Sequence, residues 1–163
     1  MIVPLPDGWA VAVSVIAWIA TCFGVGRWAV TWPDERLEQT GPLTTIRRWE
    51  RDGRFWIRHV RVLRWKDRLP EAGAFFAGGR DKRHLPDQRA EGLRTFRRET
   101  IRAERVHWCI LCSGPLHLIW CRPFLGACMV AFGVLFDAPF IVVQRTNRGR
   151  HDRVIERRAA ARR

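Results

Sequence analysis

The sequence predicts a mainly α-helical, small integral membrane protein with about three membrane segments and an amphipathic, basic cytoplasmic region. Two apolar runs, at about residues 9–30 and 124–143, have the length of a bilayer crossing. A shorter apolar run occupies about residues 107–121, and the rest of the chain is so basic that the net charge reaches +13. We therefore expect one membrane domain over residues 1–163, with a cytoplasmic region at about 31–106 and a basic tail at 144–163.

The first apolar segment begins near Trp9 and is expected to remain in the mature protein. Residues 9–26 carry no charged side chain, and Trp9, Trp28 and Trp32 suit the two membrane interfaces. A cleaved secretory signal needs a positively charged start, whereas the residues before Trp9 include no lysine or arginine. A retained membrane segment is therefore predicted.

Lysine and arginine are concentrated in residues 31–106 and 144–163, where they outnumber aspartate and glutamate. Between the second and third apolar runs the only such residue is Arg122. Because cytoplasmic loops carry the excess of positive charge, we expect a multi-pass protein of the cell membrane with its N-terminus outside and its C-terminus in the cytoplasm. Anionic headgroups attract basic patches of this kind, so the lipid bilayer is the expected partner and nucleic acid is not.

Residues 44–66 are expected to divide at Asp52-Gly53, with aromatic, aliphatic and arginine side chains mixed on both sides. This pattern fits either an amphipathic helix at the membrane surface or a strand. We favour the interfacial helix because tryptophan and arginine together suit the headgroup zone. A further helix is predicted from about Ala90 onward.

The second apolar run, at 107–121, is short for a crossing and contains Gly114-Pro115. It either begins one turn earlier or is re-entrant. The third run contains Asp137, which lies about 10 Å along a helix from Gln144 and is costly in lipid unless it is paired or protonated. Asp137-Ala138-Pro139 is expected to interrupt the helix, either facing a cavity below His107 or forming a hydrogen-bonded structural break.

All five cysteines lie in apolar runs. Cys109 and Cys112 have the spacing of a metal or redox pair, but the chain has no second pair. We expect small apolar packing residues, no metal site and no disulfide framework.

The polar stretch Glu99 to Trp108 adjoins the second apolar run and contains a potential general base. At about 100° per residue, Glu104 and His107 fall on one face of a helix. A carboxylate that orients an imidazole is half of a general-base device, so we predict His107 as the base and Glu104 as its orienting partner. The alternative is that these charged residues simply end a cytoplasmic helix. The candidate catalytic residues are His107, Glu104, Glu99 and Asp137, with His84 as a rival base.

Several short motifs occur in order along residues 32–150. They are Pro33-Asp34, Trp49-Glu50-x-x-Gly53-x-Phe55-Trp56, Arg64-Trp65-Lys66, Arg83-His84-Leu85, Glu99-Thr100-x-Arg102-Ala103-Glu104-x-x-His107-Trp108, Pro139 and Val143-Gln144-Arg145-x-Asn147-Arg148. In this order they resemble the glycosyl-4,4'-diaponeurosporenoate acyltransferases, small membrane proteins of staphyloxanthin-type carotenoid glycoside synthesis. The chain departs from the family pattern at Thr146 and Gly149, where tyrosine and proline are expected, and at Asp137, where asparagine is common.

The resemblance implies transfer of a fatty acyl group, from acyl-CoA as co-substrate, onto a hydroxyl of a glycosylated carotenoid or similar glycolipid, with no bound cofactor. Guanidinium groups bind phosphates bidentately, so basic residues near the predicted base are candidates for holding the donor. The candidate donor-binding residues are Lys66, Arg83, His84, Arg98, Arg102, Gln144, Arg145, Asn147 and Arg148, with Lys82 and Arg97 beside them. The expected partners are the bilayer, the acyl donor and the acceptor, and association with other enzymes of the pathway is left open.

A hypothesis from a different class is a non-catalytic membrane anchor or scaffold subunit of a lipid or carotenoid biosynthetic complex. The chain has no recognised acyltransferase nucleophile and no HxxxxD motif, which keeps this hypothesis open. The polar stretch beside the second apolar run favours an enzyme, because a scaffold does not require a paired glutamate and histidine there.

Overall fold

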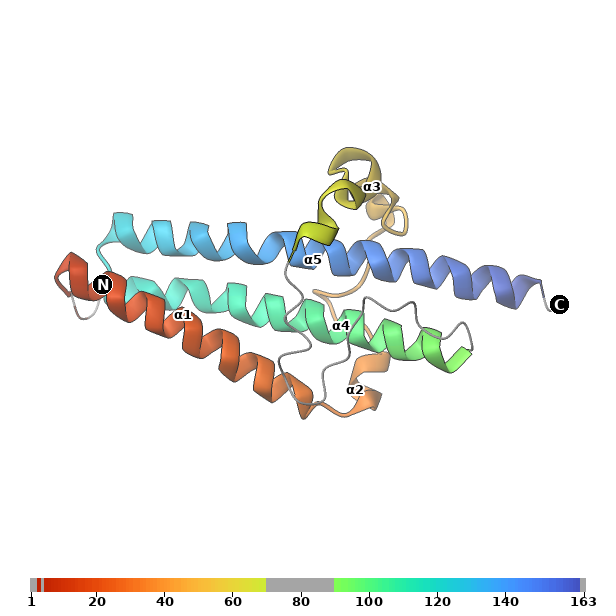
Figure 1. The fold of residues 1–163 in the computed structure, drawn as a ribbon, viewed down its shortest axis with the longest axis horizontal. Coiled ribbons are helices and arrows are strands. Elements are labelled where there is room, and N and C mark those ends of the chain that lie inside the picture. Colours follow the sequence, from red (N-terminus) through yellow and green to blue (C-terminus); the bar gives the residue numbers. More distant parts are fainter. Residues whose placement is uncertain (1–2, 4, 70–89, 162–163) are drawn as a thin grey trace.

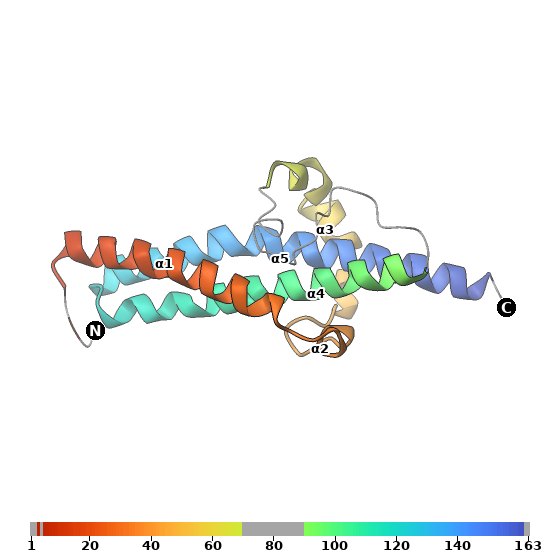
Figure 2. The same ribbon diagram turned by 60° about the horizontal axis from the view of Figure 1, so that its bottom comes forward.

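The computed structural model describes residues 3, 5–69 and 90–161. Three long helices, α1 (Asp7–Val30), α4 (Ala90–Ser113) and α5 (Pro123–Ala160), lie side by side (Figure 1; Figure 2). α1 and α5 run in the same direction and α4 runs the opposite way. The predicted mainly α-helical fold is confirmed, since the described ranges contain helices and no strand.

Shorter helices flank this bundle. α2 (Asp34–Glu38) packs against α4, and α3 (Arg54–His59) packs against α5 on the opposite side of the bundle (Figure 1). The remaining elements are the 3-10 helices η1 (Arg48–Glu50), η2 (Val62–Arg64), η3 (Lys66–Arg68) and η5 (Gly114–Ile119). The chain between α2 and α3 therefore crosses the α4–α5 pair.

Two helices, α1 and α5, are long and apolar enough to cross a membrane by length and composition. Their most apolar windows have mean hydropathies of 1.9 and 2.1, and only 17% and 22% of these windows are buried inside the structure. On α5, Phe124 and Leu135 are 83% and 76% exposed. Apolar surface of this extent is unfavourable in water, so the two helices suggest membrane association.

The prediction of about three membrane segments is wrong by this measure, because only these two helices qualify in the part of the chain that the structure describes. The apolar run at 107–121 is divided between two elements: residues 107–113 complete α4, and the chain then enters η5 at Gly114-Pro115. Proline lacks the N–H that would continue the α-helix. α4 itself begins at Ala90, far more than one turn before His107, and its first half is charged.

The expected interruption of the third apolar run is also absent. α5 continues through Asp137, Ala138 and Pro139 as one helix. A proline removes a single backbone donor, and neighbouring groups can compensate for it within a helix bundle. Asp137 therefore projects from an unbroken helix.

Residues 44–66 do not form one continuous helix. The chain divides at Asp52-Gly53 as predicted, and the stretch forms a series of short helical turns. Arg51, Asp52, Gly53 and Arg61 have positive φ angles of 48°, 54°, 83° and 52°. An L residue in the left-handed region cannot continue a right-handed helix, so these positions separate η1, α3 and η2.

The apolar end of the bundle packs around Trp18 of α1. A Cβ added at Gly133 would lie 2.6 Å from the Trp18 ring, so this glycine leaves the space that the indole fills. The indole stacks on His117 with ring centroids 4.9 Å apart, and Trp120 donates a 3.0 Å hydrogen bond to Ser14. These contacts fix α1 against the turn that joins α4 to α5.

Candidate active site

His107 on α4 and Asp137 on α5 meet across the helix pair. Nδ1 of His107 lies 2.8 Å from Oδ1 of Asp137, and the imidazole stacks on Phe140 with ring centroids 4.6 Å apart. The Asp137 side chain is fully buried, whereas 18% of the His107 side chain is exposed. A carboxylate at Nδ1 fixes the orientation and tautomer of the ring, which leaves Nε2 to exchange a proton with a reactant.

The predicted pairing of Glu104 with His107 is therefore wrong, and Asp137 supplies the carboxylate instead. Glu104 accepts hydrogen bonds from Arg145 at 2.6 Å and Arg148 at 2.5 Å, both on α5, and from Trp108 at 3.3 Å. Two guanidinium groups hold a carboxylate more strongly than a neutral imidazole does. Helical spacing within α4 could not reveal these partners, because they belong to another helix.

Glu104 is part of a buried arginine–glutamate cluster, which we define as Glu50, Glu104, Arg145 and Arg148. Arg145 lies between the two glutamates and donates to Glu50 from Nε at 2.8 Å and also from Nη2. Three of these side chains have no exposed surface, and that of Arg145 is 8% exposed. Two positive and two negative groups balance here, and removing one partner of such a buried pair leaves an uncompensated charge.

The cluster fastens residues 43–50 to the bundle. Arg145 donates to the carbonyl oxygens of Leu43 and Thr45, each at 2.8 Å, and Arg148 donates to that of Thr44. Glu50 also accepts hydrogen bonds from the Arg47 amide and the Trp56 indole. The segment between α2 and α3 is thus held at the level of Glu104, one turn from His107.

The hydrogen bonds that Glu50 accepts within and beside the cluster change its pKa. Burial opposes its ionisation, yet hydrogen bonds from Arg145, the Arg47 amide and Trp56, together with the Arg145 charge, lower the pKa of Glu50 below its ordinary value of 4.5. Glu50 is therefore a carboxylate at neutral pH.

Two predicted donor-binding residues on α4 bind acidic side chains instead. Arg98 donates to Asp34 at 2.9 Å and to Glu38 at 2.6 Å. Arg102 pairs with Glu99 and lies 3.7 Å from Asp34. These contacts attach α2 to α4, and they place Glu99, a predicted catalytic residue, in an ion pair away from the His107–Asp137 pair.

The other predicted donor-binding residues are dispersed. Gln144 is buried on α5 and Asn147 is half-buried, whereas Lys66 pairs with its neighbour Asp67 on η3. η3, which carries Lys66, packs against η2, and η2 packs against α5. Lys82, Arg83 and His84 lie outside the described residues.

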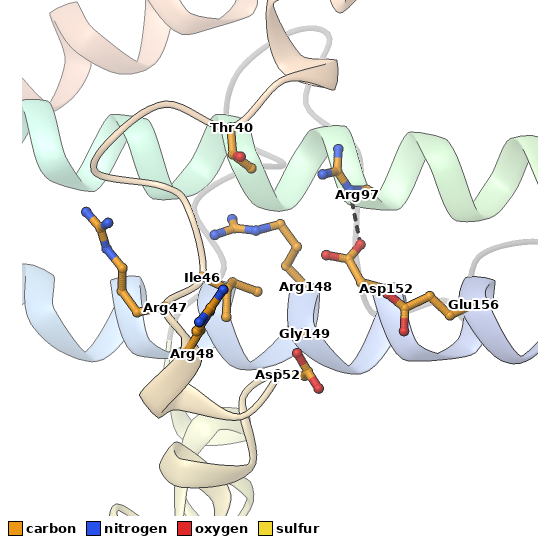
Figure 3. A pocket seen from close by; sticks show the side chains of 10 residues that line it. All are labelled: Thr40, Ile46, Arg47, Arg48, Asp52, Arg97, Arg148, Gly149, Asp152 and Glu156. Carbon is orange, nitrogen blue, oxygen red and sulfur yellow. Dashed lines mark hydrogen bonds and ion pairs between the residues drawn. The ribbon is translucent and has the colours of Figure 1, made fainter.

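A polar cavity of about 300 Å³ lies between α4, α5 and the segment that joins α2 to α3 (Figure 3). Its walls include Arg148 and four charged residues from other positions, Arg47, Arg48, Arg97 and Asp152. Arg97 donates to Asp152 at 3.1 Å. Cys109 and Cys112 are free thiols, and the described residues contain no group of three or more His, Cys, Asp and Glu able to hold a metal ion.

Comparison with known proteins decides the family. The Glycosyl-4,4'-diaponeurosporenoate acyltransferase family matches residues 41–157. The chain belongs to this family. A Staphylococcus haemolyticus relative of that name is 32% identical over 108 residues, which cover 63% of this chain and 59% of the relative. A Staphylococcus aureus relative of the same name is 25% identical over 139 residues, covering 82% of this chain and 80% of the relative. No solved structure matches the chain with statistical significance.

Membership of this acyltransferase family confirms the resemblance inferred from the ordered motifs. The matched range contains the His107–Asp137 pair and the whole arginine–glutamate cluster. Two residues of the site were missed from the sequence, Glu50 and Phe140. Glu50 belongs to the motif Trp49-Glu50-x-x-Gly53, but the motif alone does not indicate what Glu50 binds. Phe140 follows Asp137 by one helical turn, so helical spacing places it on the same face of the helix.

Proposed function

We propose that this protein is a membrane acyltransferase that moves a fatty acyl group from acyl-CoA onto a hydroxyl of a glycosylated carotenoid or similar glycolipid. The observation that carries the proposal is the contact between His107 and buried Asp137, in a chain that belongs to an acyltransferase family. An alcohol is a weak nucleophile at neutral pH, and a positioned base accelerates its attack by about 10²- to 10⁴-fold.

In the proposed reaction, Nε2 of His107 accepts the hydroxyl proton while the acceptor oxygen attacks the thioester carbonyl carbon. Asp137 stabilises the imidazolium that forms. The tetrahedral intermediate then collapses, the carbon–sulfur bond breaks, and His107 returns the proton to the departing thiolate. The products are the ester and coenzyme A, and the histidine is neutral again.

The proposed orientation in the cell membrane follows from the direction of the apolar helices. α1 and α5 run the same way, so their basic C-terminal ends lie toward one side and their N-terminal ends toward the other, and the chain returns between them along α4 and η5 (Figure 1). Positive charge favours the cytoplasmic side, which puts the N-terminus outside and the C-terminal tail in the cytoplasm. The acceptor's apolar tail would lie beside the lipid-facing helices, and the donor would arrive from the cytoplasm.

The test is ester formation by the purified chain alone. The full chain in detergent is supplied with acyl-CoA and a glycosylated carotenoid, and the ester is measured by mass spectrometry. We expect product with the glycosylated acceptor and none with the same carotenoid lacking its sugar. Absence of product from monodisperse protein, together with ester formation once the other pathway enzymes are added, would favour the scaffold hypothesis.

A further inference from the structure

The polar cavity is lined by arginines from several segments of the chain. Arg47 directly precedes η1 and Arg48 is its first residue, while Arg97 comes from α4 and Arg148 from α5. Figure 3 shows the Arg148 side chain rising from α5 toward Thr40, with Arg47 on one side of it and Arg97 on the other. A group bound here would meet guanidinium groups from several directions.

Arg148 is the lining residue whose orientation is fixed by the surrounding protein. Its side chain is fully buried, Nη1 donates to Glu104 and Nη2 to the Thr44 carbonyl, so its orientation is fixed. Its Nε has no hydrogen-bond partner among the described residues. A buried N–H donor of a cationic group is costly to leave unpaired, which points to a ligand acceptor at this position.

Four arginines, Arg47, Arg48, Arg97 and Arg148, line the cavity against three carboxylates, so the lining side chains carry one net positive charge and Arg148 is also paired with Glu104. Asp152 is paired with Arg97, while Asp52 and Glu156 line the same space. Arg150, Arg153 and Arg157 follow on the same part of α5, and the protein as a whole has a charge of +13. The chemistry therefore favours an anion, and the fork geometry of arginine suits phosphate.

The spacing of residues along α4 and α5 gives the separation between the cavity and the His107–Asp137 pair. Arg148 follows Asp137 by three helical turns on the same face of α5, a separation of about 16 Å, and Arg97 precedes His107 by about 15 Å along α4. The pantetheine arm of coenzyme A is about as long as four or five extended residues, on the order of 15 Å. The two separations match the distance between the phosphates and the thioester of an acyl-CoA.

We propose that the polar cavity binds the diphosphate end of the acyl donor, while the thioester lies at His107. This inference rests on the proposed function, because it names the binding site for that donor. It assigns Arg48, Arg97 and Arg148 to phosphate recognition and gives Arg98 and Arg102 a structural role.

The test measures binding of coenzyme A and of pantetheine, which lacks the phosphates, to the full chain in neutral detergent. Arg48→Gln removes an exposed charge from the cavity without touching the arginine–glutamate cluster. We expect coenzyme A to bind about tenfold more weakly and pantetheine to bind unchanged. Arg58→Gln, an equal change of charge on α3 outside the cavity, is the matched control and should alter neither. Glu156→Gln removes a negative charge from the cavity and should strengthen coenzyme A binding.

Equal weakening by Arg48→Gln and Arg58→Gln would overturn the proposal, because it would indicate general charge attraction. A second experiment adds phosphatidylglycerol vesicles to the protein with bound coenzyme A and measures whether the lipid displaces it. If these lipids bind the cavity and coenzyme A does not, the cavity is a headgroup site and the proposal is also overturned. The two proposals fail separately: coenzyme A binding without ester formation contradicts the function alone, and ester formation with an unchanged KM for acyl-CoA in Arg48→Gln contradicts the cavity alone.

Discussion

Asp137 is buried beside His107 and is expected to act through it. Asn at this position can still accept the hydrogen bond from Nδ1, whereas Leu cannot. We expect Asp137→Asn to lower kcat because a neutral amide does not stabilise the imidazolium, and Asp137→Leu to lower it further, by at least about 100-fold, because the ring also loses its orientation, with little change in KM. Steady-state kinetics on monodisperse protein checks this. Wild-type kcat in Asp137→Leu would contradict the positioning role, and Asp67→Asn on exposed η3 is the control.

Because Glu50 is buried as a carboxylate, the stability of the folded protein is expected to fall at acidic pH. Because its pKa in the folded protein is lower than 4.5, its stabilising contribution is complete above that pH and is lost as the pH falls through the folded value. We expect Glu50→Gln to lower Tm at pH 6, and the Tm difference from wild type to shrink as the pH falls below 4.5 and through the lower pKa of the folded state. Thermal unfolding in detergent across this range measures it, and a constant difference would refute the assignment.

Sequence reasoning found individual residues of the site better than their partners. His107, Glu104, Asp137, Arg145 and Arg148 were all candidates from motifs and helical spacing. Their partners were not predictable, because periodicity relates residues within one helix, and both the His107–Asp137 and Glu104–Arg148 contacts join different helices.

At the scale of elements, the turn at residues 51–53 docks on α5 through a close backbone approach. A Cβ at Gly149 would lie 2.3 Å from the Asp52 carbonyl carbon and oxygen. We expect Gly149→Ala to destabilise the protein by about 1–3 kcal/mol, since backbone must move to accept the methyl group. Gly24→Ala on α1 meets nothing within 4 Å and should be neutral or slightly stabilising. Denaturation midpoints compare the two variants, and equal midpoints would contradict the close docking.

The three long helices were foreseeable, α1 and α5 from their apolar runs and α4 from the helix predicted from about Ala90 onward, whereas the short ones were not. The sequence predicts the division of residues 44–66 at Asp52-Gly53, but not the positive φ angles at Arg51 and Arg61, which divide the stretch further. Such angles are uncommon for residues with a Cβ and leave little mark in a sequence. The buried contacts of Glu50 with Arg145 hold η1 against α5 although the flanking residues adopt these unfavourable angles.

At the scale of the whole molecule, exposed apolar side chains on α5 are expected to face lipid. Arginine in place of Leu135 would put a charge on this face, at a cost of about 2.5–3.5 kcal/mol near the middle of a membrane helix. We expect Leu135→Arg to increase the fraction of protein released from membranes by alkaline carbonate. Val154→Arg, on the polar half of α5, is the control, and equal release of both variants would contradict a lipid-facing Leu135.

The division of the molecule into a basic half and an apolar half was predictable from charge placement alone. The number of helices long and apolar enough to cross a membrane was not, because the run at 107–121 is continuous in hydropathy but divided in structure at Gly114-Pro115. Three-dimensional packing also decides which charged residues are structural: Arg98 and Arg102 attach α2, although their sequence context suits donor binding.

The central claim is that acyl transfer depends on His107 as the base. The most direct measurement is ester formation by wild type, His107→Ala and the control His59→Ala, which changes an exposed histidine on α3, at matched monodisperse yields. We predict that His107→Ala loses at least about 100-fold in kcat/KM while His59→Ala and wild type are equal. Wild-type activity in folded His107→Ala would show that the base is elsewhere and contradict the account.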